Sequence, residues 1–151
     1  MNKKLFAAGL SFALCMAYAL IVSAEDKPDV LVKQRQAAMT LQAKYFGPLQ
    51  VMAQGKVPYN TNLVTQNASY LNVLGKMPWD GFAASTKDVK SRALPEVFKE
   101  SAQFKKAQEQ LQESVGKLVA LKGGSEESAK DVITEIGKTC GGCHDHFRQK
   151  N

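Results

Sequence analysis

The chain has 151 residues, with 20 Lys and Arg against 14 Asp and Glu, which gives a formal net charge of +6 at pH 7. This basic excess is mild, and no dense block of lysine and arginine is interleaved with aromatic residues, so the composition gives no support to nucleic-acid binding. The length is that of one domain of ordinary size with a single hydrophobic core.

Residues 1–24 are predicted to be a secretory signal peptide. A short basic head precedes an uncharged apolar run over residues 5–22, and Val22-Ser23-Ala24 fits a small-residue cleavage site. The alternative is a membrane anchor, because the run has about the minimum length that spans a bilayer. Cleavage after Ala24 would remove that anchor and leave residues 25–151, which is 151 minus 24, or 127 residues, with a net charge of +4 once the two lysines of the head are lost. We therefore expect an exported, periplasmic protein.

The first half of the mature chain predicts two amphipathic helices, over residues 28–52 and 61–75, because apolar residues recur there at three- and four-residue steps. A loop rich in turn-forming residues separates them at residues 54–60. Pro48 lies inside the first helix, and we expect it to kink that helix or to break its hydrogen-bond ladder near Lys44.

The second half of the chain predicts two more helices. After an irregular stretch over residues 76–94, a third helix begins near Pro95 and stops at Gly123-Gly124. Ser125 is then an N-cap candidate for the fourth helix. One continuous stripe runs along that fourth helix: Ala129, Val132, Ile133, Ile136, Cys140, Cys143, His144 and Phe147. Four amphipathic helices with short connections predict an all-α fold, an antiparallel four-helix bundle.

The strongest chemical signal is Cys140-Gly141-Gly142-Cys143-His144, which reads C-x-x-C-H, the attachment signature of c-type haem. Residues three and four apart share one face of a helix, so both thiols and the imidazole point the same way. Each thiol can add across a haem vinyl group to form a thioether, and His144 can ligate the iron from the proximal side. We predict one haem c, attached covalently through Cys140 and Cys143. Because Cys15 leaves with the signal peptide, no disulfide framework is expected.

Two other interpretations of this motif are weaker. A redox-active C-x-x-C normally lies where a strand runs into a helix in a β-α-β pattern, and no strand pattern surrounds this one. A tetrahedral zinc site needs four ligands. After the three residues of the motif, the only other histidine is His146, which projects elsewhere on the helix.

The order of these features resembles the cytochrome c′ family of class II c-type cytochromes. The resemblance covers the whole mature chain and rests on four places: Arg35-Gln36 in the first helix, residues 55–59 after it, Pro78-Trp79 before the third helix, and the stretch from the haem motif to Arg148. The C-x-x-C-H motif alone occurs in many unrelated cytochromes, whereas the order and spacing of all four features are more specific. The resemblance implies a four-helix bundle with covalently attached haem.

Several residues take family roles through this resemblance. Arg35 and Gln36 resemble residues that contact a haem propionate, and a guanidinium suits a carboxylate by charge and fork geometry; a solvated arginine is the alternative. Trp79 and Phe82 resemble aromatic residues that pack near the haem edge, although ordinary core filling predicts almost the same contacts. Arg148 resembles the basic residue beside the proximal face, and its alternative is a surface arginine near the chain end.

Met39 resembles the residue that faces the distal side of the haem in this family. In many relatives the residue at that position does not coordinate and the iron is five-coordinate, whereas a low-spin branch uses a methionine as the sixth ligand. A thioether is a competent ligand for haem iron, and methionine is also a flexible core filler. We expect Met39 to occupy the pocket without a strong bond to iron, and ligation by Met39 and His144 together is the alternative. Met52 and Met77 are weaker candidates.

The two ligation states imply different functions. An apolar distal pocket walled by Met39, Gln42, Tyr45 and Phe46, or by some of them, would disfavour water and anions while admitting the small gases NO and CO. An iron saturated by methionine would make the protein an electron carrier. An enzyme such as a peroxidase would need a distal base, and the first helix has no histidine, so no enzymatic activity is expected.

The resemblance also implies a homodimer, paired chiefly through the first and second helices. Val32, Tyr70 and Val73 are apolar residues on these helices that a single core stripe does not use, and exposed apolar patches often mark interfaces. We also expect a redox partner, which the sequence does not identify.

Overall fold

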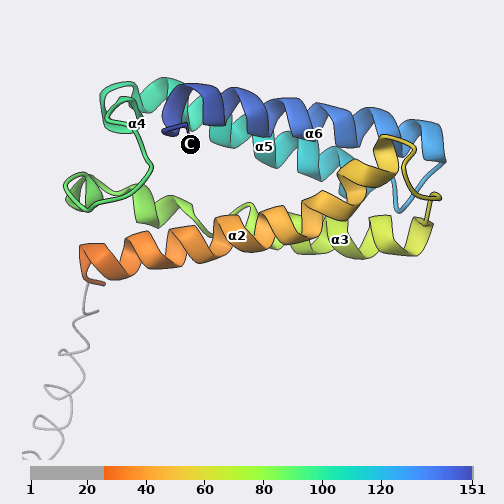
Figure 1. Cartoon of the computed structure of the whole chain (residues 1–151), viewed down its shortest axis with the longest axis horizontal. Coiled ribbons are helices and arrows are strands. Elements are labelled where there is room, and N and C mark those ends of the chain that lie inside the picture. The colour runs from red at the N-terminus through yellow and green to blue at the C-terminus, as the bar shows by residue number, and fades with distance from the viewer. Residues whose placement is uncertain (1–25, 151) are drawn as a thin grey trace, which may run out of the picture.

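The computed structural model describes residues 26–150, and this part of the chain is all-α, as predicted (Figure 1). The predicted signal peptide and its cleavage site lie outside the described residues. Within residues 26–150, no helix is long and apolar enough to cross a membrane.

Four long helices make up the bundle: α2 (Pro28–Ala53), α3 (Thr61–Leu74), α5 (Ser101–Ala120) and α6 (Glu126–Phe147). Successive long helices run in opposite directions, as Figure 1 shows from the order of the colours. Helix α2 packs against α3 and α6, and α5 packs against the same two helices. The prediction of an antiparallel four-helix bundle is therefore confirmed.

Helix α2 continues through Pro48 and ends at Ala53. Proline lacks the N–H that would bond to the carbonyl one turn earlier, and its ring crowds that carbonyl, so a bend is the expected result when a helix does not stop there. Figure 1 shows the last part of α2 turning away from the line of its first part, in agreement with a kink rather than a break.

The helix predicted to begin near Pro95 is divided in two. A short helix, α4 (Glu96–Lys99), is followed by Glu100, which leaves the helical region with φ −113° and ψ 45°, and α5 then begins at Ser101. The Glu100 carboxylate lies 2.6 Å from Nε2 of His146 on α6. Glu100, the residue at the bend, thus contacts a neighbouring helix. The periodicity of apolar residues within one segment does not indicate such a contact, so the division of the helix could not be predicted from it.

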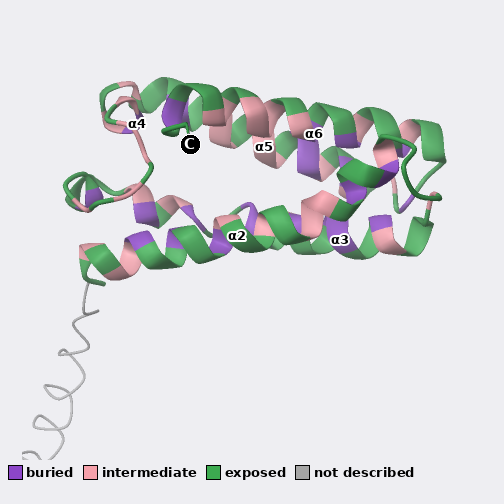
Figure 2. Cartoon of the chain, viewed as in Figure 1, coloured by how far each residue is buried: buried purple, intermediate pink, exposed green. Residues whose placement is uncertain are grey.

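Two clusters of buried side chains form the core. The larger one lies among the four long helices and includes Leu49, Met52, Val64, Leu71, Leu118, Ile133 and Ile136. The smaller one consists of Val97, Phe104 and Phe147, with Trp79 and Phe82 packed against it. Figure 2 shows the buried positions on the inward sides of the helices and the exposed ones on their outer sides.

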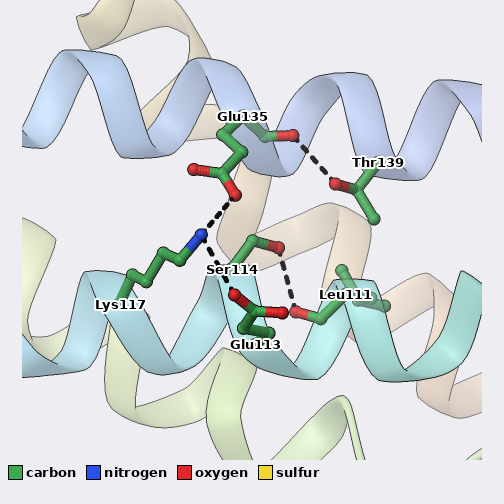
Figure 3. Close-up of polar contacts among 6 residues, drawn as sticks. All are labelled: Leu111, Glu113, Ser114, Lys117, Glu135 and Thr139. Carbon is green, nitrogen blue, oxygen red and sulfur yellow. Dashed lines mark hydrogen bonds and ion pairs between the residues drawn. The ribbon is translucent and has the colours of Figure 1, made fainter.

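An exposed ion pair links the last turn of α5 to α6. Lys117 Nζ lies 2.9 Å from Oε1 of Glu135 on α6 and 3.3 Å from Oε1 of Glu113 on its own helix (Figure 3). These contacts raise the pKa of Lys117, chiefly through hydrogen bonds to the two carboxylates. Such solvent-exposed pairs add little stability, so the packing of apolar side chains holds α5 against α6.

The turn between α5 and α6 uses an unusual backbone. Lys122, Gly123 and Gly124 all have positive φ, at 49°, 92° and 57°, a region that glycine adopts without a steric penalty. The Tyr59 hydroxyl, from the loop before α3, donates a hydrogen bond to the Gly123 carbonyl. Ser125 then caps α6, accepting a hydrogen bond from the Ser128 N–H at 3.2 Å. The predicted helix stop and N-cap are both confirmed.

Candidate functional site

A cavity of about 670 Å³ lies among α2, α5, α6 and the irregular segment that precedes α4. Its volume is within the range typical of ligand-binding pockets in proteins. All nine site residues predicted from the sequence line it: Arg35, Gln36, Met39, Trp79, Phe82, Cys140, Cys143, His144 and Arg148. Residues separated by more than 100 positions along the chain are therefore gathered around one space.

Helix α6 brings the haem motif to this cavity. The predicted stripe is observed. Four of its apolar residues are buried: Ala129, Ile133, Ile136 and Phe147. The three residues of the haem motif, Cys140, Cys143 and His144, are half-buried because they border the cavity. Gly141 also lines the cavity, and a Cβ built on it would have no atom within 4 Å. The motif thus presents both thiols and the imidazole to open space rather than to packed side chains.

Burial controls the protonation of these three groups. It raises the pKa of Cys140 to about 11, with the nearby Cys143 adding to the shift, and it also raises the pKa of Cys143. Burial lowers the pKa of His144, and the positive charges of Arg148 and Arg92 lower it further. The neutral imidazole, which is the form that binds a metal, is therefore favoured.

Helix α2 forms the opposite wall of the cavity. Met39, Gln42 and Phe46 line it, but Tyr45 does not. The Tyr45 ring instead packs on the Tyr70 ring of α3, with centroids 4.6 Å apart. Three of the four possible distal residues therefore line the cavity, and Tyr45 does not, because one residue along a helix turns the side chain by about 100° away from that of Phe46.

The amide of Gln42 is already engaged in the protein. Its Nε2 donates a hydrogen bond to the carbonyl oxygen of Leu74 at the end of α3, 3.0 Å away. This hydrogen bond uses one of the two N–H donors of the Gln42 amide. Its neighbours in the wall, Met39 and Phe46, are apolar, so this part of α2 offers few polar groups to water or to an anion.

Arg35 is buried at the edge of the cavity, with 5% of its surface exposed. Its Nη1 donates a hydrogen bond to the carbonyl oxygen of Gly81, and its guanidinium carbon lies 4.2 Å from the centre of the Phe82 ring. A guanidinium has five N–H donors, so further donors remain for a carboxylate. Burial lowers the pKa of Arg35, but a guanidinium remains charged in proteins.

Aromatic side chains close one end of the cavity. Trp79 and Phe82, in the 3-10 turn η2 (Trp79–Phe82), pack against Phe104 of α5, and the Phe82 and Phe104 centroids are 4.7 Å apart. The Trp79 indole N–H donates to the Gly75 carbonyl at 2.8 Å. The structure thus places both predicted aromatic residues at the cavity and also in the smaller core cluster.

Arg148 lies just beyond α6. Its N–H still bonds to the His144 carbonyl at 3.2 Å, but its backbone is extended and pairs with Ala93 in an isolated bridge. This pairing brings Arg92 to the cavity, where its Nη2 donates to the Gln149 carbonyl at 2.9 Å. Arg92 is not among the site residues predicted from the sequence, and no local pattern indicates it, because its position depends on that pairing.

Three other candidates lie away from the cavity. Met52 is buried in the larger core cluster, where its sulfur accepts a hydrogen bond from the Asn60 N–H at 3.4 Å. Met77 is 58% exposed. His146 is exposed and contacts Glu100. The low rank that the sequence analysis gave to these residues agrees with their positions.

The residues around the cavity fit a haem. The lining is mostly aliphatic and aromatic, which suits a flat macrocycle, while two thiols and one imidazole lie on one wall and three arginines lie at its edges. Thiols and an imidazole on adjacent positions are the groups that c-type attachment requires, and guanidinium groups suit haem carboxylates. Among residues 26–150, no group of three or more His, Cys, Asp or Glu is placed to hold a metal ion without such a cofactor.

A four-helix bundle whose last helix presents C-x-x-C-H to an internal cavity defines a helical c-type cytochrome. The family model described as Cytochrome C' matches residues 30–148. The chain therefore belongs to the cytochrome c′ family, whose members carry covalently bound haem c, and the resemblance inferred from the sequence is confirmed.

The chain is similar to named relatives over almost the whole length of those proteins. A cytochrome c′ of Rubrivivax gelatinosus is 36% identical over 127 residues, covering 83% of this chain and 98% of that protein. A cytochrome c′ of Alcaligenes xylosoxydans xylosoxydans is 33% identical over 125 residues, covering 82% of this chain and 97% of that protein. A ferrous variant of the Alcaligenes xylosoxidans protein with bound NO matches with a TM-score of 0.77 and 31% identity, over 84% of this chain and 99% of that chain. A variant with bound carbon monoxide matches with a TM-score of 0.75 and 33% identity, over 82% and 98% of the two chains.

Proposed function

We propose that this protein is a periplasmic monohaem cytochrome with a mainly five-coordinate haem, which binds small gases such as NO and CO, transfers electrons, or does both. One observation carries the proposal: Cys140, Cys143 and His144 on α6 and Met39 on α2 all line the same cavity. The haem would supply a redox-active iron with one axial position available to a small ligand.

The residues of this chain would hold the cofactor in distinct ways. Cys140 and Cys143 would bind it covalently as thioethers, and His144, favoured as the neutral imidazole, would be the proximal ligand. Arg35 and Gln36 would donate hydrogen bonds to a haem propionate. Arg148 would place a positive charge beside the proximal face, because it lies one residue beyond α6 and its charge already acts on His144.

The distal side would select ligands by polarity. Met39 and Phe46 are apolar, and the amide of Gln42 is bonded to the Leu74 carbonyl. A buried anion or water that finds no hydrogen-bond partner is disfavoured, whereas neutral NO and CO need none. The NO and CO complexes of relatives that share more than 30% identity with this chain support this choice of ligands.

A second function is favoured by one feature, the position of Met39 in the same cavity as His144. If the Met39 sulfur binds iron, the haem becomes six-coordinate and low spin, and the protein becomes an electron carrier closed to gases. The chain contains two histidines, both on α6, so the α2 wall supplies no histidine as a distal base for a peroxidase. We therefore propose binding or electron transfer rather than enzymatic catalysis.

The proposal includes export and pairing. Residues 1–24 would direct secretion and be cleaved after Ala24, which would leave residues 25–151 as the cytochrome domain. Two copies would pair through α2 and α3, where Leu41, Tyr70 and Val73 are exposed. Val32, predicted to be one of the interface residues, is 3% exposed and belongs to the core, because η2 packs on α2 with Gly81 against Leu31 and Arg35.

The optical spectrum of the ferric protein tests the ligation state. We expect a high-spin spectrum for the wild type, no change of ferric spin state in Met39→Ala, and faster CO binding to the ferrous variant because its pocket is larger. Met77→Ala is the matched control, since Met77 is 58% exposed. A low-spin wild type that turns high spin only in Met39→Ala would instead assign the methionine-ligated electron carrier.

Mass spectrometry tests the attachment and the processing. The mature protein should begin at Glu25 and carry the mass of one haem that survives acid extraction. Replacing both Cys140 and Cys143 by serine should make the haem extractable. Haem lost from the wild type on extraction would contradict the thioether bonds, and a mature protein that keeps residues 1–24 would contradict cleavage.

A further inference from the structure

A second hollow of about 300 Å³ lies in the seam between α2 and α6. Two residues line both this hollow and the haem cavity: Gln50 on α2 and Gly137 on α6. The two spaces are therefore neighbours, and they meet at Gln50 and Gly137.

The partition between them is thin because Gly137 has no side chain. A Cβ placed on Gly137 would lie 3.7 Å from Cζ and 3.9 Å from Cε1 of Phe46, and no other atom would come within 4 Å. The ring of Phe46 thus faces the Gly137 backbone directly. Gln50 lies one turn further along α2 and is exposed, so its flexible side chain can move aside.

A continuous face of α2 connects this partition to the distal side. Met39, Ala43, Phe46 and Gln50 follow one another at steps of four, three and four residues, and all four line the haem cavity. Residues at such steps lie on one face of a helix. The face that carries the proposed distal residue therefore extends to the seam hollow.

A haem bound in the main cavity would fill much of the space beside Met39. A small ligand that moves toward the Met39 side would then need a separate entry path. The hollow in the α2–α6 seam is a neighbouring opening that could supply it. Its outer rim is polar, with Thr134 and Lys138 on α6, while the partition itself consists of an aromatic ring and a glycine. An ion would lose its hydration at such a partition, at a large cost, whereas a neutral diatomic molecule would not.

We propose that the α2–α6 seam is the access route by which small neutral ligands reach the distal side of the haem, with Phe46 and Gln50 as its gate and Gly137 as the gap that keeps it open. This inference rests on the proposed gas-binding function. It assigns a role to Gly137 and Gln50 that the haem motif and the helix pattern do not indicate.

Flash photolysis of the CO complex of the ferrous holoprotein tests the route. In Gly137→Leu the added side chain fills the gap against Phe46, so the bimolecular CO association rate should fall several-fold and the fraction of geminate recombination should rise. Gly137→Ala, whose Cβ fits at an ordinary contact distance of 3.7 Å, should shift both quantities in the same direction by less. Phe46→Ala should speed association.

The control is Gly116→Leu on α5, where an added Cβ would have no atom within 4 Å, and it should leave CO kinetics unchanged. A readout independent of iron is xenon binding: xenon-pressurised crystals of the holoprotein should show xenon in the seam hollow beside Gly137 in the wild type and none there in Gly137→Leu. Unchanged CO kinetics in both Gly137 variants would overturn the route while leaving gas binding intact. A wild type that binds no CO would remove the proposed function and this route together.

Discussion

Arg35 on α2 donates a hydrogen bond from Nη1 to the carbonyl oxygen of Gly81, 2.5 Å away and 46 residues later in the chain. Gly81 can approach α2 this closely because it has no side chain. A Cβ on Gly81 would lie 2.4 Å from Cβ of Arg35 and 2.7 Å from the Leu31 carbonyl oxygen. The same guanidinium contacts the Phe82 ring. Arg35 thus ties α2 to the segment that carries both predicted haem-edge aromatic residues.

Removing this tie should destabilise the fold. In Arg35→Met the apolar stem is kept but the buried carbonyl of Gly81 loses its donor, and we expect the free energy of unfolding of the holoprotein to fall by about 2 kcal/mol. Urea denaturation followed by circular dichroism measures it. The control is Lys33→Met, because Lys33 is exposed and pairs with Asp29 at 3.6 Å, an ion pair of small energetic value. Equal stabilities of the two variants would refute the structural role of Arg35.

Two glycines make a matched pair for the turn between α5 and α6. Gly123 has φ 92°, and a Cβ there would lie 2.3 Å from Cγ2 of Thr61, so Gly123→Ala should destabilise the protein by more than about 1 kcal/mol. Gly116 lies within α5 with nothing within 4 Å of an added Cβ, so Gly116→Ala should stabilise it by up to roughly 1 kcal/mol. Thermal unfolding of both variants measures the difference. A neutral Gly123→Ala would contradict the strained turn.

The raised thiol pKa values should be visible in the haem-free chain. Because the pKa of Cys140 rises from an ordinary 9.0 to about 11, its alkylation by iodoacetamide at pH 8 should be slower than in urea, since thiolate is the nucleophile. In the folded state the Cys140 thiol also keeps its proton to a higher pH than in the unfolded state. The free energy of unfolding should therefore fall as the pH rises from about 9 to about 11. Peptide mass spectrometry follows the alkylation. Equal rates with and without urea would show that the thiol is not buried.

The exposed apolar residues of α2 and α3 predict dimerisation. Val73 is 57% exposed, and Val73→Asp would place a charge in the proposed interface, so it should yield a monomer with an unchanged haem spectrum. Sedimentation at micromolar concentration measures the mass. Val57→Asp is the control, since Val57 is also exposed but lies in the loop between the two helices. A monomeric wild type would remove the dimer.

Helix α6 shows how much the sequence determined by itself. Its N-cap at Ser125, its buried stripe and the shared face of Cys140, Cys143 and His144 all follow from hydrogen bonding and side-chain spacing within one segment. The order of the four long helices follows in the same way. Such features depend on contacts between residues a few positions apart, and these contacts can be inferred from spacing.

Other features were decided only by the tertiary structure. Val32 is buried because the segment containing η2 packs on α2, and Tyr45 leaves the cavity because its ring packs on Tyr70 of α3. Arg92 reaches the cavity only through the pairing of Ala93 with Arg148. In each case the position depends on a partner far away in the chain, and residue spacing within one helix contains no information about which partner packs against it.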